Sequence, residues 1–147
     1  MKKENKIRVL EIINVSQKLA KYVERSDIDN KIVIVSSDED YYYFTFTFSK
    51  LSSDSTKDTL KIWTNDLKNN SYFIDINNVY RIKKNSIIEF VSDDLENEEI
   101  SDTSQIEIVE SLINLLSNDK LNINFFTLVK NIEKEMRFKG TANLRFT

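Results

Sequence analysis

The 147-residue chain contains no histidine, no cysteine and no proline, and its single glycine is Gly140. Without histidine, no side chain has an unperturbed pKa near 7, and the Ser-His-Asp and Cys-His nucleophile systems are excluded. Zinc sites built from Cys and His are excluded as well. One glycine cannot supply a dinucleotide-binding motif or a P-loop, because both need several backbone positions without a Cβ atom close to phosphate. These absences predict a non-catalytic protein without a cofactor.

The residue usage is strongly biased. Asn, Lys, Ile, Tyr and Phe are frequent, whereas Gly, Ala, Pro and Arg are scarce. This bias is typical of a very AT-rich coding sequence, so part of the missing proline and glycine reflects the genome rather than the fold. It points to a low-GC bacterium, or to a phage or mobile element that lives in one.

The chain also lacks the long apolar runs of exported or membrane proteins. Charged and polar residues interrupt its first apolar stretch, so no signal peptide is predicted. No segment approaches the about 18 continuous apolar residues of a membrane span. We therefore expect a cytoplasmic protein with no membrane partner.

Charge is weak overall but unevenly distributed. The net charge of -3 is too small to indicate attraction to nucleic acid or membranes by itself. Residues 93–110 carry eight acids and no base, whereas residues 120–147 carry six bases and two acids. Such asymmetry is typical of complementary surfaces within one fold, of solvated linkers, or of partner-binding surfaces.

The first two thirds of the chain show helix and strand patterns in turn. Residues 6–24 place apolar side chains at helical spacing, which predicts an amphipathic helix. Lys84 and Asn85 fit a two-residue hairpin turn between the last two strands. Connections between strands are short, which favours antiparallel neighbours because parallel pairing needs a long crossover. Strands are predicted over residues 31–37, 41–49, 58–65, 71–76, 80–83 and 86–91.

The remaining third reads as a linker and helices. Residues 93–103 are acidic and poor in large apolar side chains. Ser104 and Glu107 then match a capping box directly before an apolar run at helical spacing. A second helix is predicted over residues 124–139, and Gly140 suits the position that follows a helix.

These patterns together predict one α+β domain that spans residues 1–147. Its expected parts are an N-terminal helix, an antiparallel sheet of five or six strands, and a C-terminal helical hairpin packed on the sheet. The expected divisions are residues 1–25 for the helix, 31–92 for the sheet, 93–103 for the acidic linker and 104–140 for the hairpin.

The aromatic strand over residues 41–49 is the most conspicuous positive feature. Alternation places Tyr41 and Tyr43 on the face opposite an apolar row, so this face is open as a contact surface if no helix covers it. Exposed tyrosine is well suited to interfaces. The sequence therefore predicts a partner-binding surface formed by Tyr41 and Tyr43 together with the acidic connection Asp38, Glu39 and Asp40.

Two other uses of these residues stay open. Aromatic and basic side chains on a sheet can stack bases and bind phosphates. The alternative is thus a nucleic-acid-binding regulator that uses Trp63, Tyr80, Arg81, Lys83 and Lys84. The third is an enzyme with a metal held by carboxylates of the acidic connection, but no calcium-loop spacing accompanies that cluster, so no metal site is expected.

The favoured hypothesis is a binding protein that acts by occupying the surface of a partner protein, either a host or a phage protein. Small domains with few catalytic side chains are common among accessory proteins of phages and mobile elements. We therefore expect an inhibitor of the anti-defence type, directed for example against a nucleic-acid-binding host protein.

Overall fold

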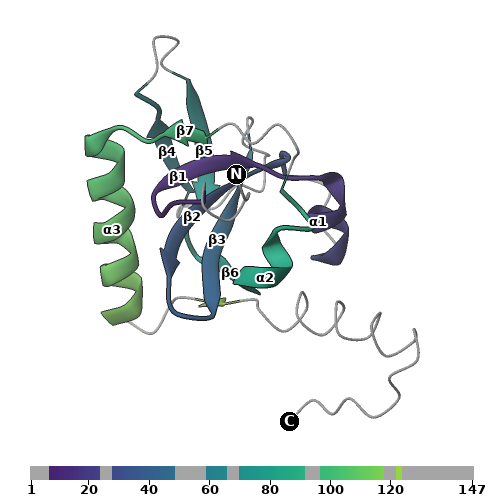
Figure 1. Ribbon diagram of the computed structural model, residues 1–147. Helices are drawn as coiled ribbons and strands as arrows, with labels where there is room; N and C mark the ends of the chain where they lie inside the picture. The colour runs from purple at the N-terminus through teal and green to yellow at the C-terminus, as the bar shows by residue number, and fades with distance from the viewer. Residues whose placement is uncertain are drawn as a thin grey trace, which may run out of the picture.

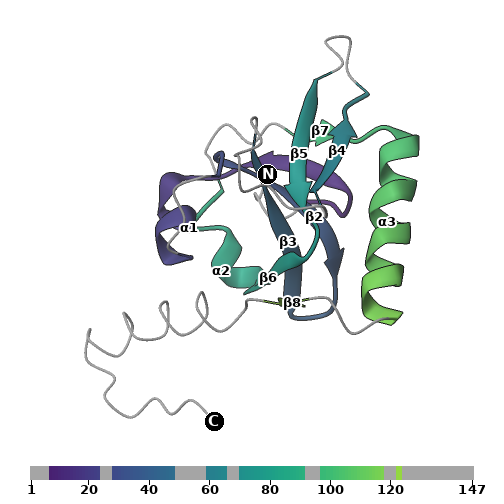
Figure 2. The ribbon, with the colours of Figure 1, turned by 180° about the vertical axis from the view of Figure 1, so that it is seen from behind.

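The computed structural model describes residues 7–23, 28–48, 59–65, 70–91, 97–117 and 122–123 (Figure 1). They form a curled sheet with two short helices on one face and a long helix on the other (Figures 1 and 2). The helices are α1 (Gln17–Tyr22), α2 (Lys84–Ile87) and α3 (Asp102–Ser117). The strands are β1 (Glu11–Asn14), β2 (Lys31–Ser37), β3 (Tyr41–Phe48), β4 (Thr59–Trp63), β5 (Ser71–Asp75), β6 (Asn78–Lys83), β7 (Asn97–Glu99) and β8 (Asn122–Ile123).

The strands follow the order β4-β5-β3-β2-β1-β7, and neighbours along this path are antiparallel. The long strand β3 pairs along its other edge with two strands in turn: β6 meets its first half and β5 meets its last two residues. The hydroxyl of Thr45 lies where β5 gives way to β6, 3.1 Å from the carbonyl oxygen of Asp75 and 3.0 Å from that of Asn78. A buried threonine therefore fixes the change of partner.

The two ends of this strand order meet. Just beyond β4 and β7, Thr64 and Ile100 form an antiparallel bridge. On either side of it, Asn65 N donates to Glu99 O and Ser101 N donates to Trp63 O, both at 2.9 Å. Because the first and last strands of the path are joined, the sheet curls back on itself.

The centre of the sheet is buried on both faces. In β2, Ile32 and Ile34 contribute to a first core that includes Leu19 of α1 and Ile87 of α2. The alternate residues of β2 contribute to a second core that includes Ile108 of α3. The continuous apolar run in β2 is the pattern expected of a strand covered on both sides.

The predicted N-terminal helix is wrong over much of its length, because residues 11–14 form β1 and only residues 17–22 are helical. β1 pairs with β2 on one edge and with β7 on the other. Its adjacent residues Ile12 and Ile13 belong to the two different cores, and both are fully buried. Consecutive apolar residues of this kind fit a helix pattern as well as a doubly buried strand.

The predicted strand over residues 86–91 and the turn before it are also wrong. Lys84 begins α2, and its backbone N donates to Asp40 O at 2.9 Å. Phe90 N then donates to Ile87 O at 2.9 Å, and both side chains enter the first core. The spacing of three residues between them is helical, although the short apolar segment could not distinguish a helix from a strand.

The predicted linker over residues 93–103 contains β7, and the helix after it begins earlier than expected. α3 begins at Asp102, and Ser101 Oγ accepts a hydrogen bond from Ser104 N at 3.3 Å. Ser101 is therefore the N-cap, while Ser104 lies inside the helix and is buried. The sequence pattern predicted the wrong N-terminus for this helix, because Ser104 and Glu107 match a capping box and Ser101 does not.

The mixed α/β class, the antiparallel sheet and the helix after it are confirmed, whereas the hairpin is not. Its predicted second helix, residues 124–139, lies outside the described residues. The last described segment, β8, pairs in parallel with β6. Within the described ranges, no helix is long and apolar enough to cross a bilayer.

Candidate protein-binding surfaces

The turn between β2 and β3 is held by the carboxylate of Asp38. Its Oδ1 accepts hydrogen bonds from the backbone N of Asp40 at 2.9 Å and of Tyr41 at 2.8 Å. Its Oδ2 accepts one from the Tyr43 hydroxyl at 2.8 Å. These donors, with the Tyr43 hydroxyl first, lower the pKa of Asp38 below its usual value. Asp38 therefore stabilises the turn, and Glu39 and Asp40 are exposed beside it.

The two predicted tyrosines lie together, next to an arginine of β6. Tyr43 is paired with Arg81 across the two strands, and the Arg81 guanidinium carbon lies 4.2 Å from the centroid of the Tyr41 ring. The hydrogen bond to Asp38, followed by burial, raises the pKa of Tyr43. Both tyrosines are half-buried. We call the set Asp38, Glu39, Asp40, Tyr41, Tyr43 and Arg81 the turn surface.

The residues predicted to bind nucleic acid do not form one surface. Tyr80 is buried in the first core, with its ring centroid 5.7 Å from that of Phe44 and 5.3 Å from that of Phe46. Lys84 is half-buried, and its Nζ lies 5.2 Å from the ring centroid of Tyr42. Trp63 lies on β4, which is separated from β6 by β5 and β3. Arg81 and the exposed Lys83 lie on β6.

Trp63 instead belongs to an aromatic row that runs across β4, β5 and β3. Lys61 Nζ lies 4.7 Å from the Trp63 ring centroid and 5.7 Å from that of Phe73. Phe73 stacks on Phe48 with centroids 6.4 Å apart. Sequence reasoning missed Lys61, Phe73 and Phe48, because cross-strand register decides that they meet. The sequence held one sign of this row: Lys61 and Trp63 are two residues apart on one predicted strand, so they lie on the same face of the sheet.

A polar cluster, Lys31–Tyr72–Glu98, connects β2, β5 and β7, and it was also missed. Lys31 Nζ donates to Glu98 Oε2 at 2.6 Å and to the Tyr72 hydroxyl at 3.2 Å. The Tyr72 hydroxyl lies 2.8 Å from both carboxylate oxygens of Glu98. The members come from positions 41 and 26 residues apart, so no local spacing signals them.

The contacts within the cluster favour the protonated forms of Lys31 and Tyr72. Burial alone lowers the pKa of Lys31, but its hydrogen bonds to Glu98 and Tyr72 outweigh burial and raise that pKa above its usual value. Burial, and next the hydrogen bond to Glu98, raise the pKa of Tyr72. Neither group can act as a base near neutral pH. The cluster is an ion-pair network that joins three strands.

Helix α3 has two apolar faces. One is directed to the sheet: Ile108 is fully buried in the second core, and Ser104 Oγ accepts a hydrogen bond from Trp63 N at 2.9 Å. The other face stays exposed and has the spacing i, i+3, i+7, i+10. It consists of Ile106 (57% exposed), Val109 (40%), Ile113 (59%) and Leu116 (59%), which we call the α3 stripe.

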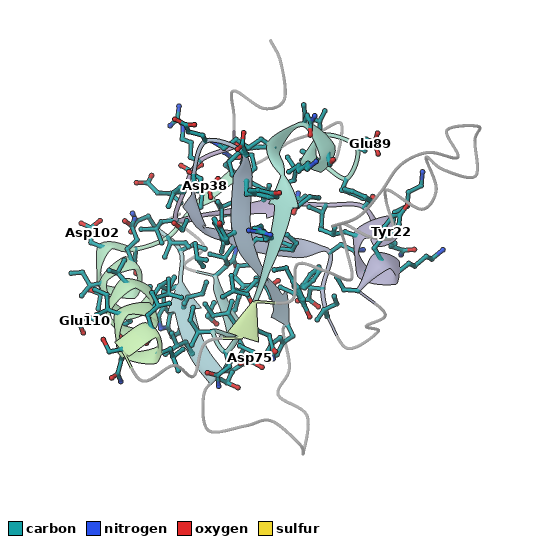
Figure 3. All side chains as sticks on the ribbon, turned by 90° about the horizontal axis from the view of Figure 1, so that it is seen from below. Tyr22, Asp38, Asp75, Glu89, Asp102 and Glu110 are labelled. Carbon is teal, nitrogen blue, oxygen red and sulfur yellow. The ribbon has the colours of Figure 1, made fainter. Side chains whose placement is uncertain are left out.

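Acidic side chains border the α3 stripe. Glu110 follows Ile106 by four residues and precedes Ile113 by three, so it lies beside both on the helix surface. Asp102 precedes Ile106 by four residues, and both acidic side chains are exposed. Figure 3 shows Asp102 and Glu110 on the side of α3 that faces away from the sheet. The helix, residues 102–117, contains no lysine or arginine.

Comparison with protein-family models, with curated protein sequences and with solved structures gave no match for this chain. Among the residues that the structure describes, no group of three or more His, Cys, Asp or Glu side chains is arranged to hold a metal ion. The surfaces themselves are thus the basis for a functional proposal.

Proposed function

We propose that this chain is a non-catalytic binding protein that acts by occupying the surface of a partner protein. The observation that carries the proposal is the α3 stripe. A helix that already buries one apolar face on a sheet leaves four further large apolar side chains between 40% and 59% exposed. A helix that is apolar on both sides is normally covered on both sides, and a contiguous exposed apolar patch is typical of an interaction site.

The turn surface supplies a second contact region. Tyr41 and Tyr43 combine large area, few rotatable bonds and a polar tip, which are the properties of good interface residues. Asp38 is engaged within the turn, so Glu39 and Asp40 are the carboxylates offered to a partner. An aromatic patch with carboxylates at its edge suits a basic protein surface, such as a groove that binds nucleic acid.

The narrower hypothesis is that the chain is an accessory inhibitor of a phage or mobile element, directed against a host defence protein. Its support is the AT-rich residue bias and the lack of histidine and cysteine. The partner would then be a host or phage protein.

A nucleic-acid-binding regulator is the second candidate function, and the aromatic row favours it. Trp63 is 41% exposed, and Lys61 lies over its ring. Aromatic side chains with a nearby cation can stack successive bases of a single strand. Binding of this kind weakens steeply with salt and would be lost with Trp63→Ala.

The test is a tagged pull-down with and without nuclease treatment, followed by affinity measurements on the captured protein. We expect Ile113→Glu to weaken binding by roughly thirtyfold, about 2 kcal/mol, because it places a charge in the centre of an apolar contact. The double change Tyr41→Ala/Tyr43→Ala tests the turn surface in the same way.

Asn114→Glu is the matched control, because it adds the same charge at an exposed position of α3 outside the stripe. It should not weaken binding, and its melting temperature is measured beside that of Ile113→Glu. Unchanged affinity in the Ile113 and tyrosine variants, or a loss that merely follows unfolding, would contradict the proposal. Capture that nuclease treatment abolishes would favour the nucleic-acid alternative.

A further inference from the structure

We propose that the α3 stripe docks an amphipathic helix of the partner protein, with lysine or arginine along the edge of its apolar face. This inference rests on the proposed function and names the class of partner. Three properties of α3 carry it: the shape of the stripe, the charge of its border, and the charge of the whole helix.

The shape of the stripe fits a helix. Its side chains lie three or four residues apart from Ile106 to Leu116, so they form one continuous seam over about 15 Å of helix axis. Such a seam is the surface that a second helix covers by interdigitating its own apolar side chains. The other face of α3 is fixed on the sheet through Ile108 and Ser104, so the seam is presented on a rigid support.

The border of the stripe selects positive charge. Glu110 lies at one edge, beside Ile106 and Ile113, and Asp102 precedes Ile106 by four residues at the N-terminal end. Both side chains are exposed. A docked helix brings the residues beside its own apolar seam close to this border, where lysine or arginine is attracted and aspartate or glutamate is repelled.

The same charge argues against a second copy of this chain as the occupant. In a pair of α3 helices the acidic borders of both copies would meet, and residues 102–117 contain no lysine or arginine to neutralise them. Like charges placed opposite each other disfavour a wrong partner. The uniform charge of the helix therefore favours a basic partner over self-association.

The experiment uses the full chain and two synthetic helical peptides of about 20 residues. Both carry the same leucine seam, but one has lysine and the other glutamate beside it. We expect the lysine peptide to bind at least about tenfold more tightly. The difference should shrink as salt rises from about 0.05 to about 0.5 M, because salt screens exposed charges.

Reversing the charge of the acidic border in the protein is the most direct test of charge selection. Asp102→Lys/Glu110→Lys should reverse the preference, so that the glutamate peptide binds more tightly. Ile113→Glu should abolish binding of both peptides, whereas the control Asn114→Glu should retain the preference of the wild type. Melting temperatures of all variants establish that each one is folded.

Several results would overturn the inference, and they separate it from the proposed function. Equal binding of both peptides means that the stripe docks helices without charge selection, which leaves the proposed function intact. No binding of either peptide refutes the helix partner, while loss of the captured protein in Ile113→Glu would still support a protein-binding stripe. If neither peptides nor protein depend on Ile113, both proposals fail.

A second copy of this chain, or another segment of the same chain, could cover the α3 stripe instead of a partner helix. Each gives a different experimental result, and either result would overturn the inference. A dimer in sedimentation equilibrium that Ile113→Glu dissociates identifies a second copy. Residues 124–139 combine apolar side chains with four bases and two acids, so they are the competitor within the chain. Hydrogen exchange of the full chain tests them: protection in this segment that disappears in Ile113→Glu would assign the stripe to it.

Discussion

At the scale of single residues, the Lys31–Tyr72–Glu98 cluster shows how partly buried charges join strands of a small sheet. Its side chains come from β2, β5 and β7, strands that the sheet order separates. Each polar group has a partner within the cluster, and the ion pair is only partly buried, with the Lys31 side chain 32% exposed. The cluster therefore adds a polar connection across the curl, beside the backbone bridge of Thr64 and Ile100.

Tyr72→Phe removes the hydroxyl of this cluster and should lower the free energy of unfolding by about 1 kcal/mol at neutral pH. The folded-state pKa values of Tyr72 and Lys31 are raised, so their stabilisation is complete below their usual pKa values, 10.0 and 10.5. It is lost as pH rises through the folded-state values. The difference in stability between wild type and Tyr72→Phe should therefore narrow above pH 10.

Urea unfolding at a series of pH values between about 7 and 11 measures this difference. Tyr41→Phe is the matched control, because it removes an equal hydroxyl outside the cluster. A constant difference between wild type and Tyr72→Phe across the whole range would show that the hydroxyl contributes nothing through its pKa.

At the scale of elements, α3 separates two roles on one helix. Ile108 completes the second core, whereas Ile113, five residues later, lies in the α3 stripe. The two isoleucines have the same volume and the same helix propensity. They differ only in the face on which they lie, and this difference makes them a direct test of whether the stripe is free in the folded protein.

Ile108→Ala should destabilise the protein by about 2–5 kcal/mol, because it leaves a cavity in a packed core. Ile113→Ala should change stability by no more than about 0.5 kcal/mol, because its side chain is 59% exposed. Urea unfolding of both variants measures the two values. A loss with Ile113→Ala as large as that with Ile108→Ala would mean that the stripe is already covered within the folded chain.

At the scale of the whole molecule, the sheet depends on chain segments from both ends of the described region. β7 follows most of the other strands in sequence, yet it pairs with β1 and joins the end of β4. α3 then covers the second core, to which Ile12, Val33 and Ile74 belong. Residues 1–92 therefore cannot complete their own sheet or cover both of its faces.

A fragment of residues 1–92 lacks β7 and α3, so we expect it to be insoluble or molten. Removal of α3 exposes the second core, and removal of β7 leaves β1 as an open edge, which favours aggregation. Circular dichroism, dye binding and sedimentation of the purified fragment check this expectation. A monomeric fragment with sharp, cooperative unfolding would show that residues 1–92 fold independently.

The local sequence pattern predicted an element correctly where a single periodicity of apolar residues, helical or two-residue, extended over its whole length. β2 matches the predicted strand over residues 31–37, and β3 nearly matches the strand predicted over 41–49, because β-branched runs and strict alternation leave little ambiguity. Tyr41, Tyr43 and the acidic turn do lie together, since a short connection keeps neighbours in sequence close in space. β1 and α2 were misassigned because short apolar segments fit both periods.

The sequence by itself determined the central strands, the antiparallel class and the residue types that the chain lacks, because these follow from composition and from spacing over a few residues. Only the tertiary structure decided which side of α3 is covered, which aromatic side chains are exposed, and which distant charges meet. Tyr80 became core and Trp63 stayed on the surface through the register and curl of the sheet. Burial depends on contacts between residues far apart in the chain, and the spacing of residues along a short segment does not predict those contacts.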